Sequence, residues 1–495
     1  MNLYQKFMGG NIKKFITNFK FFLLNHKNQK ITRFIKTKTP PFIKRWVSSM
    51  IFKEELKEAR YIYSFLNRWK HNNFKSTSDH VLNFQEQKLS YIMKYAYKFS
   101  PYYKNLFDQN KINIQNVNDF FKIPLLDKEI IRKNKDQLFS KNLSKIKFTI
   151  LNTGGSTGEP MDFPASYRAG YIDRVHQQFA LELIGYEKGD KIFAFDGSSV
   201  PNRLLNKNIY WVKTSNEDLP FGRLSYSSLY LNKNTIKYYV DHFLKSKPCI
   251  FRGYPSFIND IAEYILANNI DIDFRVKGVQ LTAENAFDWQ VENIKKAFKT
   301  KVFFQYGHSE MCVFGFTKDE TYEYFCSPFY GLIEIINDKK QRVKEGEVGE
   351  IVATSFYHEA LPFIRYRTGD WALFDGIENG FVKLKRIEGR TQDFIYNKNR
   401  EKVSITAIVF GQHYHAFRNI KKWQIHQSKI GEITINIVKG ENFSKNDELE
   451  IINKFKNIGN FDVMLNFVDK IELTKRGKFR FVVVDKTLFN EMSKN

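Results

Sequence analysis

The sequence is poor in the features that mark secreted and membrane-spanning proteins. Its 495 residues include only three cysteines, Cys249, Cys312 and Cys326, whose spacing gives neither a disulfide framework nor a paired C-x-x-C motif. No apolar run approaches the roughly eighteen residues that span a bilayer. The N-terminus also lacks a compact apolar stretch followed by a small-residue cleavage site. We therefore expect a cytoplasmic protein in a reducing compartment.

Acidic residues are missing from one long segment. Residues 1–50 hold eleven Lys and Arg but no Asp or Glu, and so carry nearly half of the net charge of +25. Within this segment Ile12, Phe15, Ile16 and Phe19 fall on one helical stripe. A basic amphipathic helix of this kind either lies on an anionic membrane surface, which would make the protein peripheral at the inner membrane, or docks on the body of the protein. No recognition motif supports a specific nucleic-acid partner.

The rest of the composition is ordinary for a globular chain, with 42% hydrophobic and 26% charged residues. Residues 54–145 have a helical pattern, whereas short β-rich runs alternate with helical ones from about 147 to 385. That alternation predicts an α/β fold in layers. After Arg390 the pattern becomes smaller in scale and predicts a compact α+β module. We see no internal repeat and no low-complexity linker.

The stretch Leu151–Pro160, LNTGGSTGEP, has the glycines and hydroxyls of a phosphate-binding loop but no lysine. A P-loop needs Lys and Ser or Thr directly after its second conserved glycine, and Glu159-Pro160 stands there instead. Glycines still allow successive backbone N–H groups to converge on an anion, and hydroxyls add donors. Taken alone, the stretch is better explained as a β-hairpin turn of the same composition.

The loop is the first of a series of short motifs in a fixed order. The others are Tyr306-Gly307-His308-Ser309-Glu310, Gly346-Glu347-Val348-Gly349-Glu350-Ile351, Tyr366-Arg367-Thr368-Gly369-Asp370, Gly389-Arg390-Thr391-Gln392-Asp393 and Gly477-Lys478-Phe479-Arg480. This series resembles the adenylate-forming superfamily of acyl- and aryl-CoA ligases. Two further blocks, Phe251-Arg252-Gly253-Tyr254-Pro255-Ser256 and Leu361-Pro362-Phe363-Ile364-Arg365-Tyr366-Arg367, resemble the phenylacetate-CoA ligase family, in particular its branch from capsular-polysaccharide biosynthesis. The resemblance spans roughly residues 80–490.

The resemblance implies a large adenylate-forming, AMP-binding domain with layered α/β subdomains at residues 51–389, followed by a small mobile α+β domain at 394–495. The hinge would lie at 390–393, with Gln392 at the hinge position. The family usually has Asp or Lys there, so this departure puts rotation between conformations in question.

The resemblance also implies which residues bind ATP. The 153–158 loop would hold the β- and γ-phosphates, Tyr306 would stack on adenine, Ser309 would donate to the α-phosphate, and Asp370 would accept from the ribose hydroxyls. Glu310 is a hard oxygen ligand suited to Mg²⁺. The full implied nucleotide set is Thr153, Gly154, Gly155, Ser156, Thr157, Gly158, Ala283, Glu284, Tyr306, Gly307, Ser309, Asp370 and Arg390. Thr157 and Glu310 are also expected to be catalytic.

The positive charge missing from the loop is expected from Lys478. In the superfamily a lysine in a C-terminal G-K motif swings in to bridge the substrate carboxylate and the α-phosphate. Glu159 stands where many ligases have lysine, which removes one phosphate contact and raises the question of whether ATP binding is weakened.

The acid substrate is harder to identify from sequence. Phe251, Tyr254, Phe304 and Phe314 suggest an aromatic-lined pocket, and Arg252 would either pair with a polar group of the substrate or be structural. His308 and the three cysteines also raise the question of zinc, although no tight cysteine pair exists and ordinary buried thiols are the stronger interpretation.

The sequence therefore predicts an ATP- and Mg²⁺-dependent ligase that adenylates a carboxylic acid and transfers it to coenzyme A or to an amine or hydroxyl of a sugar or carrier. A surface- or capsular-polysaccharide pathway is the expected setting. A phenylacetate-type aryl-CoA ligase and a non-catalytic membrane-associated scaffold remain as alternatives, because a shared fold does not fix the substrate.

Overall fold

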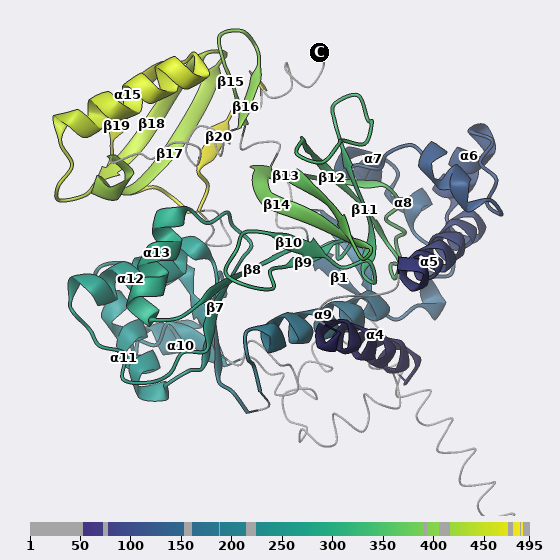
Figure 1. The fold of residues 1–495 in the computed structure, drawn as a ribbon, viewed down its shortest axis with the longest axis horizontal. Coiled ribbons are helices and arrows are strands. Elements are labelled where there is room, and N and C mark those ends of the chain that lie inside the picture. The colour runs from purple at the N-terminus through teal and green to yellow at the C-terminus, as the bar shows by residue number, and fades with distance from the viewer. Residues whose placement is uncertain are drawn as a thin grey trace, which may run out of the picture.

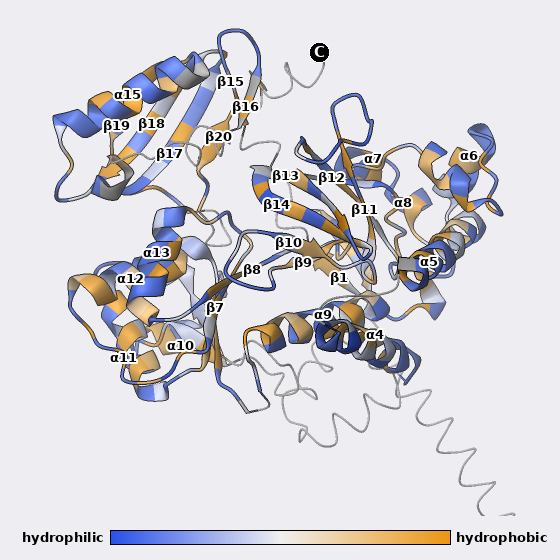
Figure 2. Ribbon diagram, in the orientation of Figure 1, coloured by the Kyte–Doolittle hydropathy of each residue, from blue (hydrophilic) through white to orange (hydrophobic). Residues whose placement is uncertain are grey.

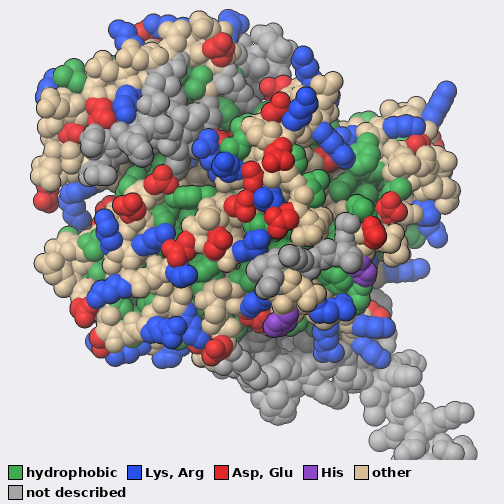
Figure 3. Space-filling view, in the orientation of Figure 1, with side chains coloured by type: hydrophobic (Ala, Val, Ile, Leu, Met, Phe, Trp, Pro, Cys, Tyr) green, Lys and Arg blue, Asp and Glu red, His purple; other side chains and the backbone are tan. Residues whose placement is uncertain are grey.

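A computed structural model describes residues 53–72, 78–152, 161–187, 189–213, 224–390, 394–404, 416–473, 479–485 and 487–488. The basic segment 1–50 lies outside these residues, so its predicted amphipathic helix remains a prediction. Among the described helices, none is long and apolar enough to cross a bilayer. On the face shown in Figure 3, acidic and basic side chains are interspersed and do not form a single basic patch.

One sheet of twelve strands runs through the large N-terminal part of the molecule (Figure 1), in the order β11-β12-β13-β14-β10-β9-β8-β7-β6-β3-β5-β4. Its strands are β3 (Ile192–Asp196), β4 (Trp211–Lys213), β5 (Leu224–Ser227), β6 (Ile250–Gly253), β7 (Gly278–Thr282), β8 (Val302–Gly307), β9 (Phe314–Phe316), β10 (Tyr324–Cys326), β11 (Gly331–Ile336), β12 (Val348–Ser355), β13 (Tyr366–Glu378) and β14 (Phe381–Arg390). From β5 to β8 neighbouring strands are parallel, and from β8 to β11 they are antiparallel. The strand pairing therefore changes from parallel to antiparallel at β8.

Helices cover both faces of the parallel half. These helices are α9 (Tyr167–Leu183), α11 (Ile236–Ser246), α12 (Pro255–Ala267) and α13 (Asp288–Phe298). Side chains alternate between the two faces of a strand. Phe251 and Phe304 accordingly lie in the core with α12 and α13, whereas Ile250 and Phe303 lie against the end of α9. Because both faces are buried, these strands have the nearly continuous apolar sequences that the strand–helix alternation predicted.

The antiparallel half is covered by the N-terminal helices. They are α4 (Lys53–His71), α5 (Ser78–Phe99), α6 (Pro101–Gln109), α7 (Lys128–Lys133) and α8 (Lys135–Leu138), and α4 lies beside α9 (Figure 1). Residues of these helices share one hydrophobic core with β9–β14. A separate hairpin of β1 (Phe148–Asn152) and β2 (Asp162–Ser166) confirms the strands predicted on either side of the glycine-rich loop. The helical pattern predicted for residues 54–145 is likewise confirmed.

The C-terminal part forms its own small α+β unit. The strands β17 (Ile420–Lys429), β18 (Glu432–Lys439), β19 (Asp462–Phe467) and β20 (Val482–Val484) make a sheet, next to a hairpin of β15 (Phe394–Tyr396) and β16 (Lys402–Ser404). Helix α15 (Lys445–Gly459) begins with a capping box of Ser444 and Asp447, and alternates hydrophilic and hydrophobic residues along its length (Figure 2). Two of its apolar residues, Ile451 and Phe455, are fully buried against the sheet.

The two parts meet where α12 and α13 face β17 and residues 479–481. Phe287 of the large part lies in the core of the small unit, with ring centroids 5.8 Å from Trp423 and 4.2 Å from Phe481. Lys422 Nζ, on β17, lies 2.7 Å from a carboxylate oxygen of Asp260 on α12. The predicted combination of a large α/β domain with a small α+β domain is confirmed, whereas the predicted boundaries at 389 and 394 stay predictions.

Candidate active site

The carboxyl ends of β6, β7 and β8 lie at one edge of the sheet, because these strands are parallel neighbours. In open α/β sheets this edge is where ligands bind. The chain leaves β7 through Ala283 and Glu284, and leaves β8 through the Tyr306–Glu310 motif. Two motifs that are separated in sequence are therefore adjacent in space.

Ala283 has a left-handed backbone with φ of 70°, which turns the chain sharply at the end of β7. The next residue, Glu284, joins the two parts of the molecule. One carboxylate oxygen accepts hydrogen bonds from the backbone N–H and the hydroxyl of Ser256, at 3.3 and 2.7 Å. The other accepts from the backbone N–H of Phe479 at 2.9 Å. Glu284 thus lies at the contact between the large part and the C-terminal segment.

Tyr306 and Asp370 form the second pair. The Tyr306 hydroxyl donates to a carboxylate oxygen of Asp370 at 2.8 Å, which links β8 to β13. Burial, followed by the negative charge of Asp370, raises the pKa of the Tyr306 hydroxyl, so that the phenol stays protonated and a donor. The backbone of Arg390, on β14, pairs with Asp370 across the ladder. Nothing further is described of the Arg390 side chain.

Glu310 is almost completely buried, with only 4% of its surface exposed. Its carboxylate accepts a hydrogen bond from the Tyr366 hydroxyl at 2.7 Å, and Lys128 Nζ lies 3.6 Å from the same oxygen. His308 Nδ1 lies 3.3 Å from the second oxygen. Burial alone would raise the pKa of Glu310, but His308, Lys128 and Tyr366 together hold it well below its usual range. Glu310 is therefore an ionised carboxylate inside the protein.

Close packing explains the glycine of this motif. A side chain at Gly307 would place its Cβ 2.9 Å from Nε2 of Gln305 and 3.4 Å from the carbonyl oxygen of Val313. Ser309 follows in the turn after β8 and is partly exposed. Its hydroxyl is therefore at the same edge of the sheet as Ala283 and Glu284.

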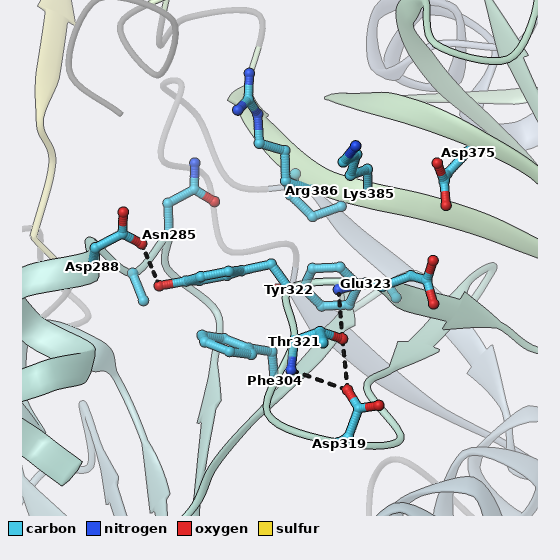
Figure 4. A pocket seen from close by; sticks show the side chains of 13 residues that line it. Asn285, Asp288, Phe304, Asp319, Thr321, Tyr322, Glu323, Asp375, Lys385 and Arg386 are labelled. Atoms are coloured by element: carbon cyan, nitrogen blue, oxygen red, sulfur yellow. Dashed lines mark hydrogen bonds between the residues drawn. The ribbon is translucent and has the colours of Figure 1, made fainter. Parts of the chain in front are cut away.

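A cleft of about 540 Å³ lies beside Tyr306 on the face of the sheet that α13 covers. Its lining residues are Asn285, Ala286, Asp288, Phe304, Asp319, Thr321, Tyr322, Glu323, Tyr324, Asp375, Lys385, Arg386 and Ile387. Figure 4 shows Tyr322 lying across the cleft with its hydroxyl toward Asp288, at 2.6 Å, and Phe304 beside it. The ring centroid of Tyr324 lies 6.4 Å from that of Phe304 and 6.4 Å from that of Tyr306. Tyr324, which lines the cleft, thus separates it from Tyr306, which is not itself a lining residue.

The residues expected to form an acid pocket are not all brought together. Arg252 lies on the face of the sheet that α9 covers, whereas Phe251 and Phe304 lie on the opposite face. Phe314 is fully buried between His176 and Tyr330, with ring centroids 5.3 and 5.7 Å away. Tyr254 is partly buried at the start of α12. A single aromatic pocket from these residues stays a prediction.

Several residues around the motifs were not predicted. Tyr366 is part of one of the sequence motifs, whereas Lys128 lies in a helical region where no sequence motif indicated a functional residue. Gln280 and Gln305 are polar residues near the carboxyl ends of otherwise apolar strands, and that placement is the signal that was available. Gln177 on α9 belongs to the same group because it contacts Arg252.

Some predicted residues lie outside the part of the chain that the structure describes. They are the loop residues Thr153, Gly154, Gly155, Ser156, Thr157, Gly158 and Glu159, the hinge residue Gln392, and Lys478. Cys249, Cys312 and Cys326 are free thiols. Within the described ranges, no group of three or more His, Cys, Asp or Glu residues is arranged to hold a metal ion.

Comparison with known proteins agrees with this arrangement. Residues 395–485 match the family model of the CapK C-terminal domain. Protein CapK of Staphylococcus aureus is 28% identical over 422 residues, which cover 81% of this chain and 89% of that protein. The phenylacetate-coenzyme A ligase of Pseudomonas putida is 24% identical over 340 residues, covering 64% and 72%.

Among solved structures, 2-hydroxyisobutyryl-CoA ligase in its postadenylation state matches with a TM-score of 0.64 at 18% identity, over 83% of this chain and 90% of that one. These comparisons confirm the expected fold, the resemblance to the adenylate-forming superfamily and its phenylacetate-CoA ligase family, and the expected class of enzyme, an adenylate-forming ligase.

Proposed function

This chain shares the fold of the adenylate-forming ligases and the C-terminal domain of CapK, and we propose that it uses ATP to adenylate a carboxylic acid and then transfers the acyl group to coenzyme A. The observation that carries the proposal is the convergence of three motifs. Ala283–Glu284, Tyr306–Glu310 and Asp370 come from distant parts of the sequence and meet at one edge of the sheet.

The proposed first step forms a bond between a carboxylate oxygen of the acid and the α-phosphorus of ATP, and releases pyrophosphate. Both reactants are anions, so the site must supply positive charge and hydrogen-bond donors where negative charge develops. Ser309 offers a partly exposed hydroxyl beside Glu310. The 153–158 loop and Thr157 would donate to the phosphates, and Lys478 would bridge the carboxylate and the α-phosphate.

The cleft beside Tyr306 is the proposed site of the nucleoside. Its volume of about 540 Å³ lies in the range of small-molecule sites. The Tyr306 ring offers a flat surface for a base, and the hydrogen bond to Asp370 fixes its orientation. The Asp370 carboxylate is proposed to accept from a ribose hydroxyl, and the side chain of Arg390 is proposed to reach the nucleotide from the next strand.

The residues present fit magnesium, which would neutralise phosphate charge when bound. Mg²⁺ is usually held by one or two carboxylates together with phosphate oxygens and water, and not by an all-protein cage. Glu310 offers one ionised carboxylate, and the described residues contain no group of three metal-ligating side chains. That donor set suits a cation shared with the ATP phosphates.

The contact at Glu284 supports the role proposed for Lys478. Phe479, the residue after Lys478 in the sequence, donates its N–H to Glu284. The C-terminal segment that begins at Phe479 is therefore in contact with the motif that follows β7. We further propose that Gln392 is the hinge, within boundaries of 51–389 and 394–495 for the two domains.

The acceptor and the cellular setting are separate parts of the proposal. Surface-polysaccharide biosynthesis is proposed from the resemblance of the 251–256 and 361–367 blocks to the capsular branch of the family, and there an amine or hydroxyl of a sugar or carrier would replace coenzyme A. The phenylacetate-coenzyme A ligases support an aryl-CoA ligase as the alternative. The basic segment 1–50 is proposed to make a peripheral membrane contact, which is also what a non-catalytic scaffold would use.

Acid-dependent exchange of ³²P between pyrophosphate and ATP tests the proposal. Exchange is expected with at least one acid from a panel of hydroxy, amino and aryl acids, and thioester formation would then identify coenzyme A as the acceptor. Lys478→Ala should abolish exchange and leave ATP binding intact, whereas Lys470→Ala, at an exposed lysine, should change neither. Exchange that survives in Lys478→Ala would refute the role of the lysine, and no exchange with any acid would favour the scaffold.

A further inference from the structure

On the face of the sheet that α9 covers, apolar side chains give way to polar ones toward the carboxyl ends of the strands. Along β6 Ile250 is followed on this face by Arg252, and along β8 Phe303 is followed by Gln305. On β7, between them, the corresponding positions are Gln280 and Thr282. Thr282 and Gln305 directly precede the motifs that begin at Ala283 and Tyr306, and Gln280 lies three residues before Ala283.

The guanidinium of Arg252 is held by three glutamines. Its Nε donates to the side-chain oxygen of Gln280 at 2.7 Å, and one terminal nitrogen donates to those of Gln177 and Gln305, at 3.1 and 3.4 Å. Gln305 also accepts from the hydroxyl of Thr282 at 2.7 Å. Since these amide oxygens face Arg252, the NH₂ groups of the glutamines point away from it.

A carboxylate lies on the other side of Gln177. Asp173, one turn earlier on α9, accepts a hydrogen bond from the Tyr330 hydroxyl at 2.8 Å. Burial raises the pKa of Asp173 and lowers that of Arg252, although each charge partly offsets the other. Two titratable groups with perturbed pKa values thus lie on either side of Gln177.

The cluster retains hydrogen-bonding capacity. Among the described residues, the NH₂ groups of Gln280 and Gln305 donate to no acceptor, and they are not among the fully buried polar atoms that lack a partner. Solvent or a ligand can therefore reach them. Arg252, Asp173 and the nearby Asp196 are partly exposed, so solvent reaches the cluster.

We infer that this cluster, which we call the polar row (Asp173, Gln177, Arg252, Gln280, Thr282 and Gln305), binds hydroxyl groups of the acid substrate, so that the substrate is a hydroxylated carboxylic acid. The inference rests on the proposed adenylation activity. The acid lies against the α9 face and the nucleoside against the α13 face, and they meet beyond the ends of β7 and β8.

Hydroxyl groups match the hydrogen-bonding groups of the polar row better than a second carboxylate or an apolar chain does. A hydroxyl both donates and accepts, and the row offers acceptors at Asp173 together with donors at Arg252 and the glutamine NH₂ groups. A second carboxylate would only accept and would lie close to Asp173 and Asp196. An aryl or alkyl chain would cut the amide donors of Gln280 and Gln305 off from water without offering an acceptor, which costs about 1–3 kcal/mol for each donor.

Pyrophosphate exchange with acids of similar size tests the inference. Glycerate, gluconate and glucuronate are compared with butyrate, hexanoate, phenylacetate and succinate. Hydroxylated acids are expected to have kcat/KM values at least 100-fold above those of the others, because a site built for hydroxyls rejects analogues that lack them. Preference for an apolar acid or for succinate, with active exchange, overturns the inference and leaves the proposed function intact. No exchange with any acid overturns both.

Variants in the polar row provide the second test. Arg252→Met and the milder Gln305→Met should lower kcat/KM for the hydroxylated acid by at least 10-fold, and lower it less, or raise it, for hexanoate. Binding of AMP should be unchanged, which shows that the variants are folded. Arg275→Met, at an exposed arginine, is the matched control and should behave like the native protein. An equal loss for hydroxylated and apolar acids in both variants would mean that the row is only structural.

Discussion

The sharpest prediction about domain movement concerns Glu284→Gln. The native carboxylate accepts hydrogen bonds on both oxygens, from Ser256 on one side and from the backbone N–H of Phe479 on the other. A glutamine side chain has one oxygen and one NH₂ group, so its oxygen can still accept from Phe479 while its NH₂ group donates to the Ser256 hydroxyl. The substitution preserves the size of the side chain and replaces a charged acceptor at the contact between the domains with a neutral one.

The size of the effect follows from the charge of the acceptor. A hydrogen bond to a charged group contributes about 1.5–3 kcal/mol and one to a neutral group about 0.5–1.5 kcal/mol. The difference of about 1–1.5 kcal/mol corresponds to roughly a 5- to 10-fold change in an equilibrium constant. The docked arrangement keeps the contact between Lys422 and Asp260 and the packing of Phe287 against Trp423, so it should persist as a smaller fraction. The first half-reaction, in which Lys478 is proposed to act, should then slow by about five- to tenfold.

Exchange and thioester formation, measured separately, provide the assay. Pyrophosphate exchange should fall in Glu284→Gln, whereas thioester formation from preformed acyl adenylate should change less, because the proposed hinge would move the domains apart between the two half-reactions. The melting temperature should change little, since the contact lies between domains. Glu292→Gln, at an exposed carboxylate of α13, is the control. Exchange within twofold of the native rate would refute the coupling between Glu284 and the lysine.

Three further predictions concern stability and nucleotide binding. Arg365→Met should lower the free energy of unfolding by about 3–5 kcal/mol, because it leaves the buried Glu334 carboxylate unpaired. In a denaturant titration, the double variant Arg365→Met with Glu334→Leu should recover most of this loss. Equal stability of the single and double variants would contradict the prediction. Burial raises the pKa of Glu263 to about 7, so the native state holds a proton that the unfolded state has lost above its ordinary pKa of 4.5. Stability should therefore fall as pH rises from about 4.5 to 7, and Glu263→Gln should flatten that part of the melting-temperature profile. Tyr306→Phe keeps the ring and loses only the hydrogen bond to Asp370. Tyr306→Ala also loses the proposed stacking on the base, which contributes about 1–3 kcal/mol. Calorimetry should therefore show that Tyr306→Phe weakens AMP binding less than Tyr306→Ala does.

The parallel half of the fold was predictable from the sequence, because its signals are local. A buried strand at 276–282 and helices at 258–268 and 287–298 were predicted, and the structure has β7, α12 and α13 there. The antiparallel half did not follow the predicted alternation, which ends at β8. There β13 and β14 are long strands with several register shifts, and Gly369 and Gly376 have positive φ within β13. Bulges and such glycines interrupt the period of two and resemble turns in the sequence.

The candidate site was predictable only as a set of motifs. Their order indicated the class of enzyme, but the spacing of Tyr306 and Asp370 says nothing of the hydrogen bond between them, which depends on how β13 crosses the sheet. The contact between Lys128 and Glu310 could not be predicted for the same reason, because Lys128 lies on a helix far from Glu310 in sequence. Such contacts depend on tertiary packing, and the local preference of a segment for helix or strand carries no information about them.

The alternation of side chains along a strand explains why one sheet edge can serve two ligands. Phe304 and Tyr306 point to the face of β8 where the cleft lies, whereas Gln305 and Gly307 point to the face of α9. A nucleoside and an acid bound on opposite faces are kept apart by the strand itself, and can react only beyond its carboxyl end. Gly307 ends the strand on the acid side, where a side chain would collide with Gln305. The polar row and the nucleoside cleft therefore depend on the same register, and a change that shifts β8 by one residue should abolish both kinds of binding together.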